Sequence, residues 1–227
     1  MAAWNVSQHK SLNLVVIGRK GDGKSSTANT ILGRLVFSTS GPVTKCQSES
    51  CKSLHGFANV TIIDTPGIFH THIENLLGMF DLAPDGIDAF ILVIRIGTFT
   101  DVIQHTLKYY REIFGAEVAR NTIAVFVGLD ELGDTFENYC KHMPQDIDEL
   151  LPKARIGINN RSDEKSTQAI SILQQVEQMT YKERYTSKDV PKRSPLYKGL
   201  KQKRIMRGPE RKKDTTMVQF MTQNVIN

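Results

Sequence analysis

An eight-residue segment, Gly18-Arg-Lys-Gly-Asp-Gly-Lys-Ser25, constrains the fold of this chain more than any other part of its sequence. It fits the pattern G-x-x-x-x-G-K-[ST] and lies between an apolar run at 12–17 and a predicted helix over 24–32. The glycines let backbone N–H groups curl around a phosphate, and the positive end of the following helix faces the same anion. The segment therefore predicts a phosphate-binding loop between a strand and a helix.

The side chains of this loop suit a nucleotide phosphate and its metal ion. Lys24 is expected to reach the β- and γ-phosphates, and the Ser25 hydroxyl to take one coordination position of Mg²⁺. A purely structural glycine-rich turn is the competing interpretation, which the strand and helix on either side disfavour. The predicted binding set in the loop comprises Gly18, Lys20, Gly21, Asp22, Gly23, Lys24, Ser25 and Ser26.

A second motif, Asp64-Thr-Pro-Gly67, follows an apolar run at 60–63, about forty residues beyond Lys24. An aspartate at a strand end can hold Mg²⁺ through water, and the Gly67 N–H can bond a γ-phosphate and release it after hydrolysis. Alone, these four residues would be an ordinary turn. After a phosphate-binding loop, they indicate the second half of a nucleotide switch.

The segment 36–47 between the two motifs is rich in Ser, Thr, Gly and Pro, so it is predicted to be a loop and the first switch. Its candidate Mg²⁺ ligands are the hydroxyls of Ser38, Thr39, Ser40 and Thr44, of which Thr44 is preferred. The complete predicted metal set is Ser25, Thr44 and Asp64.

Strand-length and helical patterns alternate along the rest of the chain. Further strands are predicted at 89–96, 122–127 and 155–158. Helices are predicted at 101–114, at 166–180 and at 135–151, the last interrupted by Pro144. Alternation of this kind indicates an α/β fold with a central, mainly parallel sheet flanked by helices.

The positive charge of the chain is concentrated in one segment. The net charge is +5, but Lys and Arg exceed Asp and Glu by nine between 181 and 214, so the remainder carries −4. We therefore predict a folded domain over 11–180 and a basic extension over 181–227. The extension could bind acidic lipid or non-specifically contact nucleic acid, or it could be a solvated appendage. No specific nucleic-acid partner is expected.

The loop that would recognise the base departs from the usual [NT]-K-x-D pattern. The strand at 122–127 leads into Phe126-Val-Gly-Leu-Asp-Glu-Leu132, which retains an acid but has neither the Asn/Thr nor the Lys. Asp130 lies where a carboxylate could accept the two N–H groups of guanine. Glu131 is the alternative if the register shifts by one residue, and a simple capping role is the remaining interpretation of Asp130.

Over 12–180 the chain resembles the immunity-associated GTPases, the GIMAP family, which are related to septins and Toc proteins. The blocks at 14–33 and 62–68 are characteristic of that family, as are the shorter ones at 96–101 and 111–115. The segment Arg155-Ile-Gly-Ile-Asn-Asn-Arg161 resembles its last nucleotide motif, in which an asparagine contacts the base. The resemblance assigns that role to Asn159 or Asn160.

The same resemblance implies a P-loop GTPase domain, or G domain, that binds GTP or GDP with Mg²⁺. It also implies nucleotide-dependent dimers or oligomers formed across the nucleotide face, and work at intracellular membranes in immune or survival settings. Two departures bear on this expectation. Gly128 and Leu129 stand where the family often has basic residues, and Thr98 stands where members often have Arg.

Hydrolysis by a single copy is expected to be slow. Ile68 occupies the position at which Ras-like enzymes orient water with Gln, and it cannot hydrogen-bond to water. The neighbouring polar candidates are His70, Thr71 and His72, and the candidate arginine donors are Arg19, Arg34 and Arg95. We therefore predict a GTPase switch whose GTP hydrolysis is slow in a single copy and is accelerated by assembly. The competing hypotheses are a P-loop ATPase or small-molecule kinase, and a nucleotide-binding scaffold without turnover.

Location can also be predicted from the sequence. No apolar run approaches the length that crosses a bilayer, and the first ten residues contain no signal-peptide core. Three cysteines are too few and too uneven in number for a disulfide framework, which indicates a reducing compartment. A cytoplasmic protein, peripheral on intracellular membranes, is expected.

Overall fold

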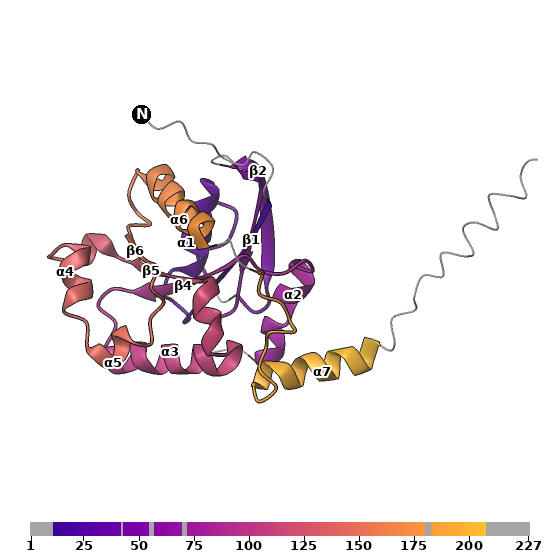
Figure 1. Ribbon diagram of the computed structural model, residues 1–227. Helices are drawn as coiled ribbons and strands as arrows, with labels where there is room; N and C mark the ends of the chain where they lie inside the picture. The colour runs from indigo at the N-terminus through magenta and orange to yellow at the C-terminus, as the bar shows by residue number, and fades with distance from the viewer. Residues whose placement is uncertain (1–10, 42, 55–56, 70–71, 180–182, 208–227) are drawn as a thin grey trace, which may run out of the picture.

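Short apolar runs separated by helices produce one six-stranded sheet in the computed structural model, which describes residues 11–41, 43–54, 57–69, 72–179 and 183–207 (Figure 1). The strands lie in the order β2-β3-β1-β4-β5-β6. Their bounds are β1 Ser11–Gly18, β2 Gln47–Leu54, β3 Phe57–Asp64, β4 Ala89–Arg95, β5 Thr122–Val127 and β6 Arg155–Ile158. Every neighbouring pair is parallel except β2 with β3, which confirms the predicted α/β fold with a mainly parallel sheet.

Helices cover both faces of the sheet (Figure 1). The α-helices are α1 Lys24–Leu32, α2 Gly78–Leu82, α3 Thr100–Phe114, α4 Phe136–Lys141, α5 Gln145–Asp148, α6 Lys165–Met179 and α7 Pro195–Arg207. The 3-10 helices are η1 Ile73–Leu76, η2 Ala116–Asn121 and η3 Leu129–Glu131. As predicted, the helical stretch after β5 is interrupted at Pro144, which caps α5.

Two hydrophobic cores lie on the two faces of the sheet, and alternation along the strands assigns each side chain to one of them. In β1, Val15 and Ile17 pack on the side of α3, whereas Leu14 and Val16 pack on the side of α1 and α6. Successive side chains of a strand point to opposite faces, so a strand buried on both sides must be apolar throughout. This explains the unbroken apolar runs that mark these strands in the sequence.

Strand β2 was not predicted, because its residues carry no apolar run. Gln47–Leu54 is polar and lies at the edge of the sheet, where it pairs with β3 alone. The predicted loop at 36–47 therefore ends at the first residue of β2. In α6, Ile172 is fully buried, whereas Ile170 is 37% exposed.

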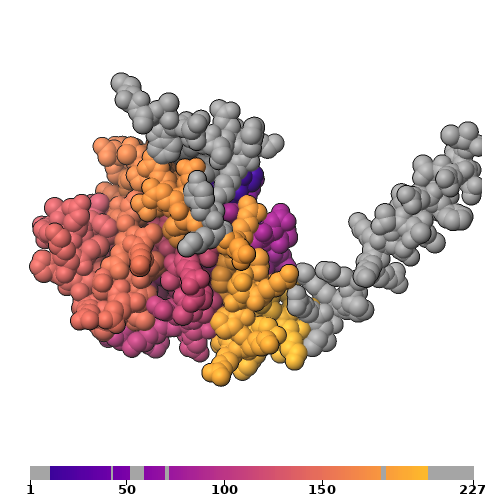
Figure 2. All heavy atoms as spheres, in the orientation of Figure 1, coloured from indigo at the N-terminus to yellow at the C-terminus, as the bar shows by residue number. Residues whose placement is uncertain are grey.

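The part of the basic segment that the structure describes packs against the domain. Tyr185 bridges to Ile87 beside the sheet, and its hydroxyl donates to the carbonyl of Phe114 at 2.8 Å. Leu196, at the start of α7, is fully buried, and α7 continues along η1. In the space-filling view these residues (yellow-orange) lie against the surface of the domain (Figure 2). The boundary at residue 180 stays a prediction, and 208–227 lie outside the described residues.

A buried ion pair holds the start of this segment. The Arg184 Nε lies 3.0 Å from the Asp88 Oδ1, and an Arg184 Nη donates to the Ser11 carbonyl at 2.9 Å. Asp88 is 3% exposed, and its other carboxylate oxygen accepts from the backbone N–H of Asn13. Removal of the arginine would leave a buried carboxylate without its counter-charge.

We expect Arg184→Met to lower the free energy of unfolding by about 2 kcal/mol, less than for a fully buried pair because Arg184 is partly exposed. Urea denaturation measures this loss. Arg120→Met is the matched control, because the Arg120–Glu117 pair is exposed on both sides and should contribute nothing measurable. Equal stability of the two variants would show that Arg184 does not hold the segment.

Candidate functional site

A pocket of about 620 Å³ opens at the carboxyl ends of the central strands. Strand β1 lies between β3 and β4, so the chain reverses its direction of progress across the sheet at β1, where α/β folds usually bind their ligands. The lining residues are Lys20, Gly21, Gly23, Lys24, Ser25, Ser26, Thr39, Gly41, Val43, Thr44, Gly67, His72, Asn75, Arg95, Val127, Gly128, Asp130, Glu131, Asn159, Asn160 and Arg161. Of the predicted binding residues, only Gly18, Asp22 and Asp64 are outside this lining.

The loop between β1 and α1 has the backbone of a phosphate cradle. Gly23 caps α1 in the left-handed region, with φ of 94°, and no side chain caps the helix there. The first N–H groups of α1 therefore face the pocket as donors for an anion. Gly18 serves packing instead, because a Cβ at that position would lie 2.5 Å from the Val93 carbonyl oxygen of β4.

Lys24 is nearly buried beneath this loop. Its Nζ donates to the Arg19 carbonyl at 2.8 Å. Burial lowers the pKa of Lys24, and the carboxylates of Asp64 and Asp22 oppose that shift. Asp22 is itself 6% exposed, and burial raises its pKa against the charges of Arg19 and Lys24. The loop thus holds an ammonium group in a site where only a strong anionic partner would fully compensate its burial.

Ser25 and Asp64 form the part of the site that suits a metal ion. The Ser25 Oγ lies 2.6 Å from the Asp64 Oδ2. The other carboxylate oxygen, Oδ1, is buried and has no hydrogen-bond partner among the described residues. Burial raises the pKa of Asp64, which the Ser25 hydrogen bond and the charge of Lys24 oppose. A hydroxyl beside a buried carboxylate with an unpartnered oxygen is a donor set that fits Mg²⁺.

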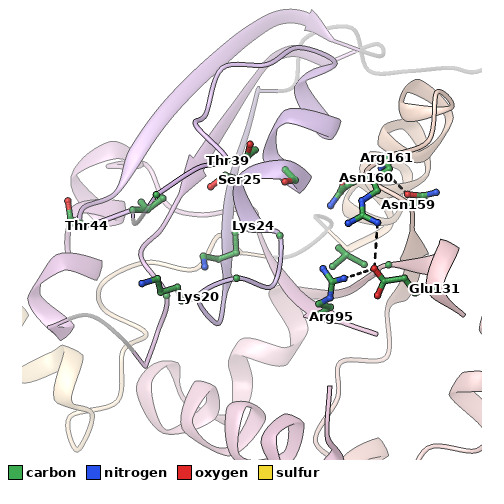
Figure 3. Close-up of a pocket in the computed structure, with 18 of the residues that line it drawn as sticks. Lys20, Lys24, Ser25, Thr39, Thr44, Arg95, Glu131, Asn159, Asn160 and Arg161 are labelled. Atoms are coloured by element: carbon green, nitrogen blue, oxygen red, sulfur yellow. Dashed lines mark hydrogen bonds and ion pairs between the residues drawn. The ribbon is translucent and has the colours of Figure 1, made fainter. Parts of the chain in front are cut away.

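The loop before β2 brings two threonines to the pocket, at different places. Both Thr39 and Thr44 line the pocket, and Figure 3 shows them at different places along it. The choice of Thr44 as a metal ligand stays a prediction.

The turn after β3 touches the phosphate-binding loop directly. A Cβ on Gly67 would lie 2.6 Å from the Lys20 backbone nitrogen, and the Ile68 N–H donates to the Gly18 carbonyl at 3.2 Å. The Ile68 side chain is 1% exposed, so it is directed into the core and away from any water near the phosphates. His72 lines the pocket, while His70 and Thr71 lie outside the described residues.

The opposite end of the pocket contains two acids and two arginines (Figure 3). The Arg95 guanidinium lies 2.5 Å from the Glu131 carboxylate. Arg161 lies 3.5 Å from Asp130 and 3.7 Å from Glu131. Both candidate base-reading carboxylates are therefore at this end, and Glu131 is held from two sides. From the sequence, Arg95 was expected only as a catalytic donor and Arg161 had no predicted role, although Arg95 ends β4 and Arg161 follows three residues after β6.

The two asparagines after β6 have different surroundings. Asn160 donates from Nδ2 to Thr27 at 3.1 Å and accepts from Thr30 through Oδ1 at 2.8 Å, so its amide fastens the loop to α1. Asn159 accepts from the Arg161 N–H through Oδ1, and its backbone N–H donates to Gln168. Since the Asn160 amide is engaged at both ends, Asn159 is the better candidate for contact with a base.

The geometry of the pocket agrees with the comparisons. The sequence model of the AIG1 family matches residues 12–206. The chain belongs to the AIG1 family. Immune-associated nucleotide-binding protein 12 of Arabidopsis thaliana is 33% identical over 194 residues, covering 76% of this chain and 49% of the relative. GTPase IMAP family member 8 of Homo sapiens is 33% identical over 188 residues, covering 76% of this chain and 28% of the relative.

These AIG1-family matches confirm the resemblance to immunity-associated GTPases, although the chain spans only about half of the plant relative's length. Among solved structures, a dimerization-deficient mutant of Arabidopsis Toc33 superposes with a TM-score of 0.62 at 18% identity, covering 78% of this chain and 88% of Toc33. Toc33 in complex with Mg²⁺ and GMPPNP gives a TM-score of 0.57 at 19% identity, with coverages of 77% and 86%. The fold is that of the P-loop GTPases.

No helix within the described part of this AIG1-family chain combines the length and the apolar character needed to span a bilayer.

Proposed function

We propose that this AIG1-family chain binds GTP and GDP with Mg²⁺ and acts as a nucleotide-dependent switch. The observation that carries the proposal is a single pocket with a phosphate cradle at one end and two carboxylates at the other. The phosphate end suits anionic oxygens, and the carboxylates suit the paired N–H donors of guanine. Solved Toc33 complexes contain GDP or GMPPNP with Mg²⁺, which supports the same ligands here.

In this proposal Ser25 and Asp64, with Thr39 or Thr44, hold the Mg²⁺. The ion would offset negative charge on the phosphate oxygens as hydrolysis proceeds. The residues of the chain hold the phosphates through Lys24 and the N–H groups at the start of α1. The backbone of Gly67 packs against Lys20 of the loop. A hydrogen bond from the Gly67 N–H to a terminal phosphate can therefore couple that phosphate to the conformation of the segment that follows.

Hydrolysis by one copy is proposed to be slow. In the reaction a water oxygen bonds to the γ-phosphorus while the bond from that phosphorus to the bridging oxygen breaks, giving GDP and inorganic phosphate. Ile68 cannot orient that water. Two of the candidate catalytic arginines are held by acids of the same chain, because Arg95 is paired with Glu131 and Arg34 with Glu49. A second copy docked across the pocket could supply the missing charge.

We therefore expect the GTP hydrolysis rate per molecule to rise as protein concentration increases, because assembly can bring an arginine of a second copy to the γ-phosphate in addition to the lysines of the first. Phosphate release measured over a dilution series tests this. Solved-structure work on Toc33 links dimerization to GTPase activity in that protein. A rate per molecule that is high and constant over the series would contradict assembly-dependent hydrolysis.

Base selectivity is the decisive test of the proposed ligand. We expect GTP and GDP to displace fluorescent GDP far better than ATP does, because adenine lacks the two N–H donors that a carboxylate would accept. Glu131→Gln and Asp130→Asn are a matched pair of charge-neutral variants. The variant that removes the reading carboxylate should lose about ten- to hundredfold in GTP affinity, and the other should lose little.

The altered base loop also supports a second candidate. Gly128 and Leu129 provide no cation that could lie above the base. The alternatives are therefore a nucleotide-promiscuous ATPase and a scaffold without turnover, which nucleotide competition and phosphate release distinguish. Equal competition by ATP would favour the promiscuous enzyme. Selective guanine binding without phosphate release at any concentration would favour the scaffold.

The cellular setting is proposed from the family. We propose a cytoplasmic protein in immune or survival signalling, associated peripherally with membranes through its basic segment. The described part of that segment presents exposed lysines at Lys188, Lys198 and Lys201. Each cation near an anionic surface contributes about 1 kcal/mol, so salt-sensitive sedimentation with phosphatidylserine vesicles is the appropriate assay.

A further inference from the structure

Lys20 of the phosphate-binding loop lines the pocket. Its side chain is exposed and lies at the same end of the pocket as Lys24 and Thr44, away from the arginines of the base end (Figure 3). Its backbone is in contact range of Gly67, because a Cβ there would lie 2.6 Å from the Lys20 nitrogen and 3.0 Å from its Cα. A phosphate bonded to the Gly67 N–H would therefore lie next to Lys20.

Four lysine or arginine side chains line this pocket among the described residues, and three of them already have partners. The Lys24 ammonium donates to the Arg19 carbonyl. Arg95 and Arg161 are paired with the acids of the base end. Lys20 has no hydrogen bond or ion pair within the described part of the chain, so its three donors are available to a ligand.

We propose that Lys20 contacts the terminal phosphate of a nucleoside triphosphate and thereby sets the preference of the pocket for triphosphate over diphosphate. This inference rests on the proposed nucleotide binding. A lysine ammonium is a compact charge on a flexible stem, which suits a phosphate group that is present in one ligand and missing from the other. A diphosphate lacks that terminal group and in this proposal offers Lys20 no partner.

The third phosphate of a triphosphate adds negative charge that the pocket must compensate. Ile68 offers no polar group that could compensate the added charge of a third phosphate. Lys20 provides that compensation from the same chain. Its contact with Gly67 also couples the phosphate-binding loop to the turn that leads into η1 and α2.

The test compares the affinities of GDP and GMPPNP, with Mg²⁺, for the full chain and three variants. Lys20→Met removes the charge at similar length, and Lys20→Arg keeps it. Lys108→Met is the matched control, because Lys108 is exposed on α3 and does not line the pocket. Thermal unfolding of each variant checks that the domain remains folded.

Lys20→Met is expected to weaken GMPPNP binding about ten- to hundredfold and to change GDP binding by less than about twofold. Lys20→Arg and Lys108→Met should keep the wild-type ratio of the two affinities. Equal losses for both nucleotides in Lys20→Met, or no change in either, would overturn the assignment while leaving nucleotide binding intact. Failure of the unaltered chain to bind either nucleotide would overturn the proposed function, and this inference with it.

Discussion

Replacement of Lys24 by Met is expected to abolish nucleotide binding at micromolar concentrations while leaving the domain folded. Lys24 is 7% exposed, and in the proposed complex its ammonium group donates to phosphate oxygens from a site with little water. The loss of two charge-assisted hydrogen bonds of about 1.5–3 kcal/mol each corresponds to roughly 10²–10⁴-fold in affinity. Titration with fluorescent GDP measures this loss.

The stability of the same variant separates a binding role from a structural one. Burial lowers the pKa of Lys24, which means that the fold disfavours its charge. Lys24→Met relieves that burial but leaves the buried carboxylates of Asp64 and Asp22 without their counter-charge. These two effects oppose each other, so the domain should stay folded with a small change in its unfolding midpoint. Lys108→Met is a control, since Lys108 is exposed on α3 outside the pocket. Tight GDP binding by Lys24→Met would rule out the proposed phosphate site.

The largest expected effect on stability comes from Phe90 on β4. Phe90 is fully buried, and its ring lies 5.1 Å from that of Phe114 and 5.2 Å from that of Tyr185, measured between centroids. Phe90→Ala should lower the free energy of unfolding by about 3–5 kcal/mol, because it removes apolar contact and leaves a cavity between the sheet and α3. Chemical denaturation measures the difference.

Phe99→Ala is the matched control for Phe90→Ala. Phe99 is 79% exposed at the start of α3, so its truncation should change stability by less than about 0.5 kcal/mol. Because Tyr185 belongs to the same aromatic cluster as Phe90, the Phe90 variant should also loosen the segment after residue 183. A Phe90 variant as stable as the Phe99 variant would mean that the cluster does not form as described.

The phosphate end of the site could be predicted from the sequence in some detail. A strand, a glycine-rich loop and a helix are consecutive in the chain, so their geometry follows from local backbone preferences. Asp64 also ends a strand, and its place beside Ser25 follows once β1 and β3 are adjacent in a parallel sheet. The assignment of Lys24 and Ser25 therefore needed only short-range information, whereas the position of Asp64 also depends on the pairing of β1 with β3.

The base end could be predicted only in outline. The sequence left Asp130 and Glu131 open, and likewise Asn159 and Asn160. The structure separates the asparagines because Thr27 and Thr30 of α1, more than a hundred residues earlier in the chain, engage the Asn160 amide. The Arg95 contact with Glu131 likewise joins the ends of two different strands. Spacing along the chain contains no information about such contacts.

By itself, the sequence determined the α/β class, the phosphate-binding loop and the central strands, since each depends on periodicity or on consecutive residues. Tertiary structure alone decided the polar edge strand β2 and the docking of 183–207 onto the domain. Both contain too few apolar residues for a local signal. Their positions arise from pairing with β3 in one case, and from contacts of Arg184 and Tyr185 with Asp88 and Phe114 in the other. The physical reason is that these segments are stabilised by partners distant in the chain rather than by their own pattern.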